Sequence, residues 1–213
     1  MSTNPASFDL RAIARSALHR YGFFSEIPQR ALKEAQAMHN DLGPVRDLGI
    51  KDMTSLLWSS IDNDDSRDLD QIEYCEEHPD GESRLMVAIA DVDHYVRQGT
   101  YIDAHAVKNG VTVYTGVEIF HMLPERLCTD LSSLVAGEDR LAVVMDFMVD
   151  AEGSVHSGEV YRALVRNRAK LVYEIVGDWF EGRAPVPESV AGVVGLEAQL
   201  RLQEKIMERL REA

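Results

Sequence analysis

Apolar and polar positions alternate along the chain with periods that predict both helices and strands. Residues 7–21 repeat apolar side chains at helical spacing, and Ser7 or Asp9 is suited to cap this helix. The residues of the apolar face are Leu10, Ile13, Ala14, Ala17 and Leu18. A second helix is predicted over 25–40, with Pro28 near its start, where its missing N–H is tolerated.

The middle of the chain has the pattern of a hairpin followed by a helix. Residues 84–92 form an apolar run typical of a buried strand, and 72–77 match its partner across a turn-rich segment at 78–83. Residues 100–109 are predicted to form a short helix that ends at Gly110. The acidic residues before 72 therefore lie just ahead of a sheet.

The last third predicts one long hairpin and two helices. Residues 140–150 and 155–171 read as the strands of the hairpin, and 172–182 and 196–213 as helices. The final helix presents an apolar face that needs a partner, formed by Leu196, Leu200, Met207 and Leu210. Strands and helices alternate unevenly, which favours an α+β fold with a mixed, largely antiparallel sheet and flanking helices over a doubly wound parallel sheet.

Length and composition are those of a globular protein. The chain has 213 residues, 45% of them hydrophobic, which is enough for one or two domains with a real core. Every apolar run is broken by charge before it reaches membrane-spanning length, so we expect no membrane association and a cytoplasmic location. Cys75 and Cys128 lie far apart without a metal-binding spacing, so two reduced thiols are expected.

The charge balance argues against non-specific binding of polyanions. Asp and Glu number 36 against 22 Lys and Arg, which gives a net charge of −14. Binding of nucleic acid or anionic lipid through charge alone needs a basic surface. A polyanion would therefore have to be held by a bound cation or by a local basic patch.

The segment 59–73 carries unusually dense acidic charge. Five aspartates fall within nine positions: Asp62, Asp64, Asp65, Asp68 and Asp70. A solvated acidic loop is the plain alternative, but in an extended backbone Leu69 turns inward while Asp68 and Asp70 point to one side. Unit charges about 4 Å apart repel by roughly 4 kcal/mol at an effective dielectric of 20, and a divalent cation removes that cost.

Calcium and magnesium are the two candidate cations for this segment. Asp62, Asp64, Ser66, Asp68 and Glu73 fit the ligand positions of a calcium-binding EF-hand loop, but the position that requires Gly holds a bulky Arg. Magnesium needs only one or two carboxylates beside water and substrate phosphate oxygens, and it serves phosphodiester hydrolysis. We therefore favour a magnesium site.

Four blocks in this order resemble the catalytic domain of the ribonuclease II / ribonuclease R family of exoribonucleases. The blocks are IDNDDSRDLDQ, RLMVAIADVDHYV, VTVYTGVEIFHMLPERLCTDLSSL and DRLAVVMDFMVDAEGSV. The resemblance implies an RNB-type catalytic domain that degrades single-stranded RNA processively from its 3′ end and releases nucleoside 5′-monophosphates with Mg²⁺, with Mn²⁺ as the alternative cation.

The resemblance also implies roles for individual carboxylates. It makes Asp62, Asp68 and Asp70 the metal ligands, with Asp68 and Asp70 catalytic and Asp70 the most critical. One departure stands out, because the family pattern usually ends in two adjacent aspartates and Gln71 occupies the second position here. Gln offers a carbonyl oxygen but no charge, so a non-catalytic RNA-binding or regulatory relative is the competing hypothesis.

RNA contacts are expected from one aromatic and several basic residues. Tyr114 matches a family aromatic that lies beside the RNA, although a packing role is the plain alternative. The basic residues of 162–170 include Arg166 and Arg168, which would share a strand face with Lys170 and track a phosphate backbone, unless they are simply solvated. Asp91 and His94 are weaker candidates near the metal.

The resemblance sets the expected domain organisation. Residues 1–23 form a short N-terminal helical segment, and 24–213 form the N-terminal portion of an exoribonuclease catalytic domain. Family catalytic domains continue beyond the point where this sequence stops, so we expect the domain to be incomplete at its C-terminus. Activity of this polypeptide alone is therefore an open question.

Overall fold

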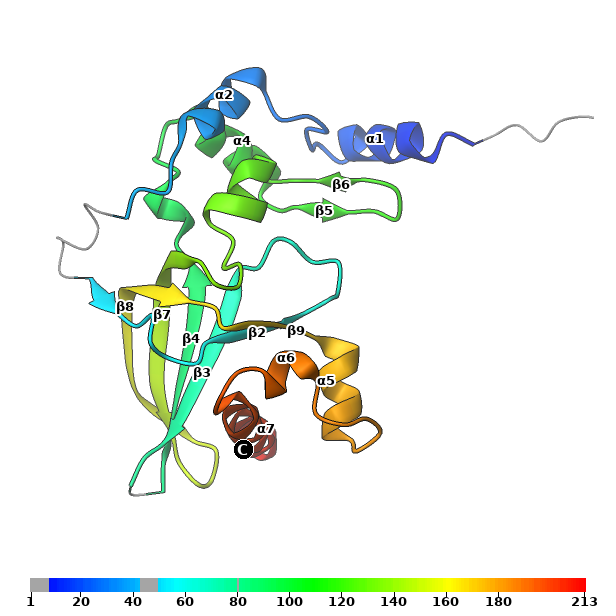
Figure 1. Cartoon of the computed structure of the whole chain (residues 1–213). Helices are drawn as coiled ribbons and strands as arrows, with labels where there is room; N and C mark the ends of the chain where they lie inside the picture. Colours follow the sequence, from blue (N-terminus) through cyan, green and yellow to red (C-terminus); the bar gives the residue numbers. More distant parts are fainter. Residues whose placement is uncertain (1–7, 43–49, 80) are drawn as a thin grey trace, which may run out of the picture. The chain divides into compact units, whose positions relative to one another are not determined.

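The computed structural model describes residues 8–42, 50–79 and 81–213 (Figure 1). The expected cap residue Ser7 and one position of the turn at 78–83 lie outside the described residues. Contacts divide the chain into two compact units, each built from segments that are distant in sequence. Unit 1 comprises Met1–Met38 and Tyr95–Leu127, and unit 2 comprises His39–His94 and Cys128–Ala213.

The described part of unit 1 contains three helices and a small hairpin. Its elements are α1 (Leu10–Arg20), α2 (Gln29–Ala37), α4 (Tyr101–Asn109), β5 (Val113–Tyr114) and β6 (Ile119–Phe120). As predicted, Pro28 stands at the start of α2 and Gly110 ends α4 in the left-handed region, with φ of 72°. The side chain of Asn109 binds the backbone N–H and carbonyl of Phe24, each at 3.0 Å, and so links the two halves of this unit.

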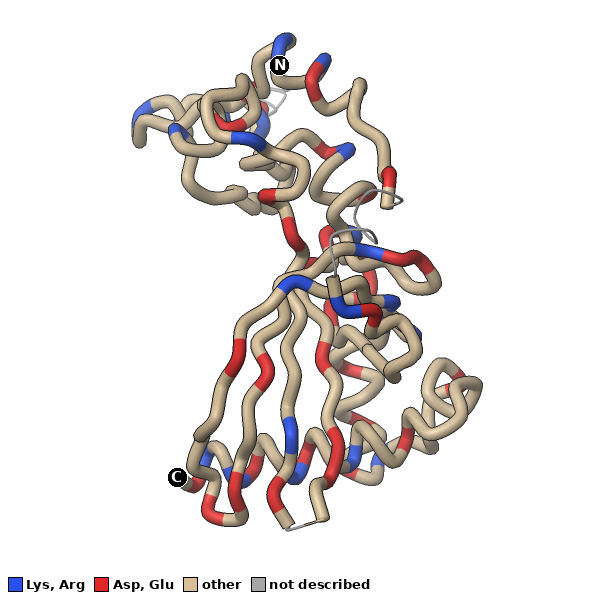
Figure 2. The backbone as a smooth tube through the Cα atoms, turned by 90° about the vertical axis from the view of Figure 1, so that its left-hand side faces the viewer, with Lys and Arg blue, Asp and Glu red and all other residues tan. Residues whose placement is uncertain are grey.

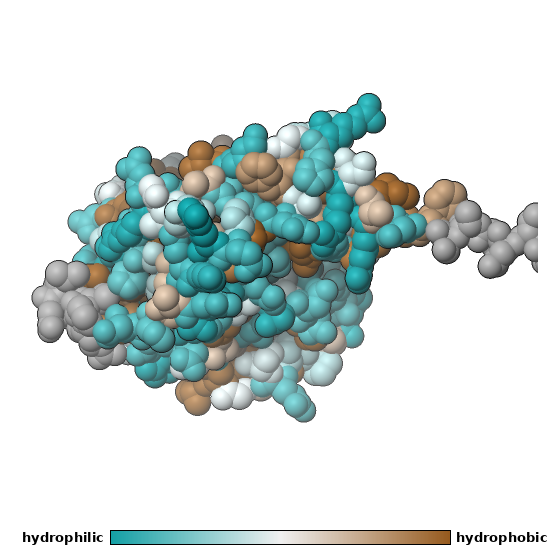
Figure 3. Space-filling model, turned by 90° about the horizontal axis from the view of Figure 1, so that it is seen from above, coloured by the Kyte–Doolittle hydropathy of each residue, from teal (hydrophilic) through white to brown (hydrophobic). Residues whose placement is uncertain are grey.

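Helix α1 is capped as predicted but is less buried than predicted. The carboxylate of Asp9 accepts a hydrogen bond from the backbone N–H of Ala12 at 3.0 Å. Only Leu18 of the expected apolar face is buried, whereas Leu10 and Ile13 are 55% and 52% exposed. Figure 3 shows this as brown surface on α1 beside the grey N-terminal residues. The helical period was correct, but the apolar face does not pack into a core within the described residues.

Unit 2 is built on a seven-stranded sheet with the order β1-β8-β7-β4-β3-β2-β9. The strands are β1 (Lys51–Asp52), β2 (Ser59–Asp62), β3 (Gln71–Glu77), β4 (Ser83–Ala90), β7 (Asp139–Val149), β8 (Val155–Arg166) and β9 (Ala169–Val172). Neighbouring strands pair antiparallel except at the two edges, where β1 pairs with β8 and β2 with β9 in parallel. The predicted α+β class with a largely antiparallel sheet is confirmed.

The sheet of unit 2 buries side chains on both faces. Leu85 and Met86 are neighbours on β4 and therefore point to opposite faces. Met86 belongs to the main core cluster around Trp58, whereas Leu85 packs with Ile206 of the C-terminal helix α7 (Leu196–Glu212). Figure 1 shows α7 together with α5 (Tyr173–Phe180) and α6 (Glu188–Ala191) along one side of the sheet.

The apolar face of α7 finds its partner within this chain over most of its length. Leu196 and Leu200 are fully buried in a cluster with α5, α6 and β9. Leu210 packs beside Ile206 against the sheet. Met207 is the exception at 48% exposed. The partner that this face was expected to need is therefore supplied by the sheet and by helices α5 and α6.

The second strand of the long hairpin is interrupted, which corrects the predicted strand over 155–171. β8 ends at Arg166, and the chain then crosses to pair with β2 as β9. Asn167 is 1% exposed and makes the crossing: its side chain donates to Ser60 Oγ at 3.1 Å and accepts from the backbone N–H of Ala169 at 3.1 Å. A buried amide therefore replaces the ladder bonds of a continuous strand.

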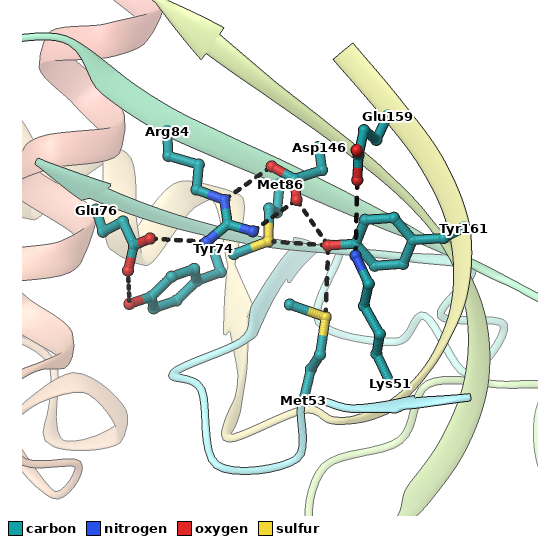
Figure 4. Close-up of polar contacts among 9 residues, drawn as sticks. All are labelled: Lys51, Met53, Tyr74, Glu76, Arg84, Met86, Asp146, Glu159 and Tyr161. Carbon is teal, nitrogen blue, oxygen red and sulfur yellow. Dashed lines mark hydrogen bonds and ion pairs between the residues drawn. The ribbon is translucent and has the colours of Figure 1, made fainter. Parts of the chain in front are cut away.

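A set of paired charges crosses β3, β4, β7 and β8, and we call it the Arg84 network (Figure 4). Arg84 binds both carboxylate oxygens of Asp146, at 2.8 and 2.6 Å, and one oxygen of Glu76 at 2.9 Å. The hydroxyl groups of Tyr161 and Tyr74 donate to Asp146 and Glu76 at 2.7 and 3.1 Å. These contacts hold the pKa of Asp146 below its usual value, chiefly through Arg84, and burial is the main reason why the pKa of Tyr161 rises to about 12.

Three further features concern the helices, the cysteines and the distribution of charge. In the part of the chain that the structure describes, no helix has the length and apolar character needed to cross a membrane. Cys75 and Cys128 are both free thiols. Figure 2 shows Lys and Arg interspersed with Asp and Glu along the strands, without a continuous basic stripe.

Candidate functional site

Asp62 and Asp70 stand at the two ends of the loop that connects β2 to β3. Asp62 is the last residue of β2, and Asp70 immediately precedes β3. Because β2 and β3 pair antiparallel, with Ser59 opposite Glu73, the loop returns to the edge from which it left. The sheet therefore brings together two carboxylates that a whole loop separates in the sequence.

Leu69 fixes the end of the loop that carries Asp68 and Asp70. Its side chain is 3% exposed and belongs to the main core cluster. Its backbone N–H donates to Ser133 Oγ at 3.0 Å, and its carbonyl accepts from the N–H of Leu134 at 2.7 Å. The prediction that Leu69 turns inward between the two aspartates is confirmed.

A cavity of about 370 Å³, which we call the acidic pocket, adjoins these carboxylates. Residues of β2, β3, β4, α5 and α7, together with Asp70, line it: Ile61, Asp62, Asp70, Gln71, Glu73, Leu85, Val87, Tyr173, Gln203 and Met207. The carboxylates and amides form a polar wall, and the aliphatic side chains form an apolar wall. Asp68 is not among the lining residues.

The carboxyl group of Asp62 lies among like charges. Burial is the main reason why its pKa is raised, and the charge of Asp70 raises it further. Lys170 opposes this effect, and Asp68 adds a smaller increase. Asp68 is therefore close enough to act on the charge of Asp62 although it does not line the pocket.

Gln71 and Glu73 lie on the same face of β3 and are joined side chain to side chain. The Gln71 amide nitrogen donates to Glu73 Oε1. Burial raises the pKa of Glu73, the bond from Gln71 lowers it in part, and the charge of Asp62 raises it again. The pocket therefore holds a third carboxylate, two positions after the site where the family pattern has its second aspartate.

The acidic pocket offers carboxylate oxygens to a divalent cation. Over the described ranges, no group of three or more His, Cys, Asp or Glu side chains is arranged to hold a metal ion. Magnesium needs only one or two carboxylates and keeps water and phosphate oxygens as its other ligands. Asp62 and Asp70 in one pocket fit that requirement, and the assignment of Asp62, Asp68 and Asp70 as metal ligands remains a prediction.

The surroundings of the loop exclude the EF-hand interpretation. That motif places its calcium loop between two helices. Here the loop lies between strands β2 and β3. The match of ligand positions along the sequence is a coincidence of composition.

The structure gives internal partners to the basic residues that were expected to bind RNA. Arg166 binds Asp139 with two nitrogens, at 2.7 and 2.6 Å. Arg168 donates to the backbone carbonyls of Thr54 and, at 3.4 Å, Leu56. Because the strand is interrupted after β8, Arg166, Arg168 and Lys170 do not share the face of one strand. The expectation that they form one basic strand face is therefore corrected.

Asp91 and His94 do not contribute to the acidic pocket. Asp91 is 4% exposed, and its carboxylate binds Arg162 through two nitrogens, each at 2.5 Å. His94 lies in the short helix η1 (Val92–His94) that follows β4. Neither residue is among those that line the pocket.

Tyr114 belongs to unit 1, whereas the acidic pocket belongs to unit 2. It is the last residue of β5, and its side chain is exposed. An exposed aromatic ring is available for stacking. Its role in RNA binding remains a prediction.

Glu73 and Tyr173 are among the pocket residues that were missed from the sequence. Glu73 was considered only as a calcium ligand, although the period of two on β3 places it on the face of Gln71. Tyr173 begins α5 directly after β9, at a junction that is visible only once β9 is known to pair with β2. The first signal was present in the sequence, and the second was not.

The protein is an α+β protein with a largely antiparallel sheet, and a loop of carboxylates between two of its strands forms the candidate site. Comparison with known proteins supplies the family. A model described as the RNB domain matches residues 50–213. The match covers well over half of the chain, so the chain belongs to the RNB-domain family. The resemblance seen in the sequence is confirmed.

The similar curated proteins are ribonucleases R. That of Thermotoga maritima is 33% identical over 163 residues, which cover 76% of this chain and 23% of that protein. That of Escherichia coli strain K12 is 32% identical over 185 residues, covering 87% of this chain and 23% of that protein. The chain thus spans less than a quarter of the length of these relatives.

Solved structures agree with this assignment. Mycoplasma genitalium RNase R in complex with ribose-methylated single-stranded RNA superposes with a TM-score of 0.85 at 25% identity, over 95% of this chain and 31% of that one. Yeast Ssd1, described as a pseudonuclease, superposes with a TM-score of 0.61 at 15% identity, over 75% of this chain and 19% of that one. The second likeness concerns the fold alone.

Proposed function

We propose that the acidic pocket belongs to a 3′-to-5′ exoribonuclease that hydrolyses single-stranded RNA to nucleoside 5′-monophosphates with Mg²⁺ or, in its place, Mn²⁺. Membership of the RNB-domain family supports the reaction class. The observation that carries the proposal is that Asp62 and Asp70, from the two ends of one loop, line the same cavity. A cytoplasmic location is part of the proposal, and the two free cysteines are consistent with it.

Asp62 and Asp70 hold the divalent cation in this proposal, and Asp68 shapes the field around them. When bound, magnesium supplies positive charge to the phosphodiester and lowers the pKa of a water molecule that it binds. The carboxylates would fix the position of the cation, and Asp70 is the most critical of them. Gln71 offers a neutral oxygen where a charged ligand is usual.

The other pocket residues suit a terminal nucleotide. Leu85, Val87 and Met207 form an apolar wall that excludes water from one side. Tyr173 presents an exposed ring at the pocket, and a base stacked on an aromatic ring gains about 1–3 kcal/mol. RNA as the partner is supported by the Mycoplasma genitalium relative, which was solved with single-stranded RNA.

The proposal also accounts for the acidic composition. A net charge of −14 repels RNA, and Arg166 and Arg168 make hydrogen bonds to groups of the protein itself. A cation held by Asp62 and Asp70 would offset the negative charge that a phosphate group meets there. The enzyme therefore needs a cation for substrate affinity as well as for chemistry.

A non-catalytic RNA-binding or regulatory protein is the second candidate. Two observations favour it: Gln71 lacks the charge of the usual aspartate, and the fold also occurs in yeast Ssd1, a pseudonuclease. This candidate keeps the fold and RNA affinity but needs no carboxylate at position 70.

One experiment separates the two candidates. The complete product of the reading frame that encodes this chain is incubated with a 5′-labelled single-stranded RNA and Mg²⁺. The exoribonuclease shortens the RNA from its 3′ end in a ladder, and Asp70→Asn abolishes the ladder. Retention of intact RNA at saturating protein, with no shortening by the wild type, identifies the binding protein instead.

A further inference from the structure

Lys170 of β9 holds the aspartate loop by its backbone. The Nζ atom donates to the carbonyl oxygen of Asp64 at 2.7 Å and to that of Ser66 at 2.7 Å. Both carbonyls lie in the middle of the loop between β2 and β3, where the chain has no helix or strand bonds. A single ammonium group therefore supplies two hydrogen bonds to a segment that the sheet does not hold.

The sheet explains why Lys170 can reach the loop. β9 pairs in parallel with β2, with Lys170 opposite Ser60 and Val172 opposite Asp62. Residues opposite one another, and residues two apart on one strand, share a face of a sheet. Lys170 and Asp62 therefore lie on one face of adjacent strands, and the side chain of Lys170 runs beneath the loop that leaves Asp62.

The partners of Lys170 are unusual for a lysine among aspartates. An exposed lysine near several carboxylates normally forms loose ion pairs, which contribute little. Hydrogen bonds from a charged donor are shorter and stronger than those between neutral groups, and here both go to main-chain oxygens. The main-chain bonds fix the path of the backbone, and neither of them is made to a carboxylate.

Two anchors thus divide the loop between them. Lys170 holds the carbonyls of Asp64 and Ser66, while Ser133 Oγ donates to the carbonyl of Arg67 at 2.9 Å and accepts from the N–H of Leu69. The loop is held from its middle to its end. The positive charge of Lys170 also lowers the pKa of Asp62 and so opposes part of the increase caused by burial and by Asp70.

We propose that Lys170 is a positioning residue for the divalent-cation site, which fixes the backbone of the loop so that Asp62 and Asp70 keep one relative geometry. The inference rests on the proposed function and deepens it. It replaces the expectation that this lysine follows the RNA backbone. Lys170 acts through the loop and does not touch the cation or the substrate.

The sign of one measurement distinguishes positioning from charge. A positive charge beside a cation site weakens cation binding, so removal of the charge alone would tighten binding. Removal of a group that positions metal ligands weakens binding, typically by about 10- to 100-fold. The two roles therefore predict opposite changes for the same substitution.

The test compares Lys170→Met, Lys170→Arg and the control Lys205→Met, which removes an exposed lysine of α7 outside the acidic pocket. Free and bound Mn²⁺ are measured by electron paramagnetic resonance, with Asp70→Asn defining the specific site. Lys170→Met is expected to weaken Mn²⁺ binding by about 10- to 100-fold. Lys170→Arg, which keeps charge and donors, loses less, and Lys205→Met loses nothing. Unchanged or tighter binding by Lys170→Met overturns the proposal.

A second readout needs neither metal nor RNA. Hydrogen exchange of the amides in 63–70 is measured in the presence of a chelator. Lys170→Met is expected to accelerate exchange there and to leave β4 unchanged, whereas equal exchange in the loop overturns the proposal. If Lys170→Met does not fold, Lys170→Gln takes its place, because it keeps an amide donor without the charge. A wild type that binds no Mn²⁺ refutes the metal site of the proposed function, and the exchange experiment still decides the role of Lys170.

Discussion

Strand β3 carries two regions of opposite electrostatic design. Tyr74 and Glu76 belong to the Arg84 network, where each carboxylate has a cation or hydroxyl donor. Gln71 and Glu73 belong to the acidic pocket, where carboxylates lie beside one another. The alternation of side chains on one strand is enough to send the two sets to different surroundings.

The direction of the pKa changes separates the two regions. In the Arg84 network, the pKa of Asp146 is lowered chiefly by its bonds to Arg84. In the acidic pocket, the pKa values of Asp62 and Glu73 are raised chiefly by burial. A lowered carboxyl pKa indicates that the ionised group stabilises the fold. A raised pKa indicates that the ionised group lowers the free energy of unfolding, and such groups are frequent at functional sites.

The largest expected effect comes from a substitution in the acidic pocket, which should abolish RNA cleavage without lowering the free energy of unfolding. Asp70→Asn should lower the cleavage rate by about 1,000-fold or more, equivalent to about 4 kcal/mol of activation free energy. The free energy of unfolding should stay within about 0.5 kcal/mol, because the residue is exposed. Gel assays and urea denaturation measure the two quantities.

Asp65→Asn is the matched control for this prediction. Asp65 lies in the same loop, is exposed and does not line the pocket. Its substitution should leave cleavage within a few-fold of the wild type. Equal losses in the two variants would mean that total loop charge, and not the carboxylate at position 70, matters.

The opposite result is expected in the Arg84 network. Arg84→Met leaves the carboxylate of Asp146, whose side chain is 12% exposed, without its ion-pair partner and should lower the free energy of unfolding by about 2–3 kcal/mol. Metal binding at the acidic pocket should be unaffected. Urea denaturation gives the first quantity, and Mn²⁺ titration gives the second.

Arg183→Met provides the comparison with an exposed ion pair. Arg183 binds Asp178 at 2.6 Å, but both side chains are at least half exposed. Its substitution should change stability by less than about 1 kcal/mol. A loss as large as that of Arg84→Met would contradict the distinction between the network and ordinary surface pairs.

The two regions should respond to pH with opposite signs. Asp146, whose folded pKa is lowered, adds stability that is fully present above its ordinary pKa of 3.8 and is lost as the pH falls below it. Glu73, whose folded pKa is raised above 4.5, reduces stability at pH 7, and this cost disappears as the pH falls to 4.5. Denaturation in a chelating buffer at several pH values measures both.

Single variants identify the groups responsible. Glu73→Gln should raise stability at pH 7 and have little effect at pH 4.5. The destabilisation caused by Asp146→Asn should shrink once the pH falls below 3.8. A Glu73→Gln variant that follows the wild-type pH profile would refute the role given to Glu73.

The smallest expected effect concerns the amide at position 71. Gln71→Asp adds a carboxylate to the pocket wall and should tighten Mn²⁺ binding by about three- to tenfold, since ligand charge sets cation affinity. Gln71→Asn keeps the amide and should change affinity little. Weaker binding by Gln71→Asp would show that the Gln71 bond to Glu73 matters more than added charge.

Much of the fold was predictable because its signals are local. Alternation placed β3 and β4 within two residues of their bounds, and Gly110 marked the end of α4 correctly. Leu69 between two aspartates was enough to predict an inward turn, because apolar side chains on an extended backbone seek a core. Asp62 and Asp70 followed from the density of charge and from the family blocks.

The remaining features depend on contacts between distant segments. The row of Arg166, Arg168 and Lys170 looked like one basic face, but a buried Asn167 breaks the strand, and each cation finds a partner elsewhere in the fold. No local pattern indicates that a lysine will bind carbonyl oxygens 106 residues earlier in the sequence. Partner choice for long charged side chains is set by tertiary structure and not by periodicity.

The position of β2 between β3 and β9 also fixes the order in which the pocket can appear during synthesis. A nascent chain that has left the ribosome only as far as the β3–β4 hairpin already displays all five loop aspartates, but β9 and Lys170 are still untranslated. At elongation rates of about 5–20 residues per second, the delay lasts several seconds. During that time the loop lacks the hydrogen bonds from Lys170 and the pairing of β2 with β9, so its carboxylates reach their final arrangement only after the strand that completes the sheet has emerged.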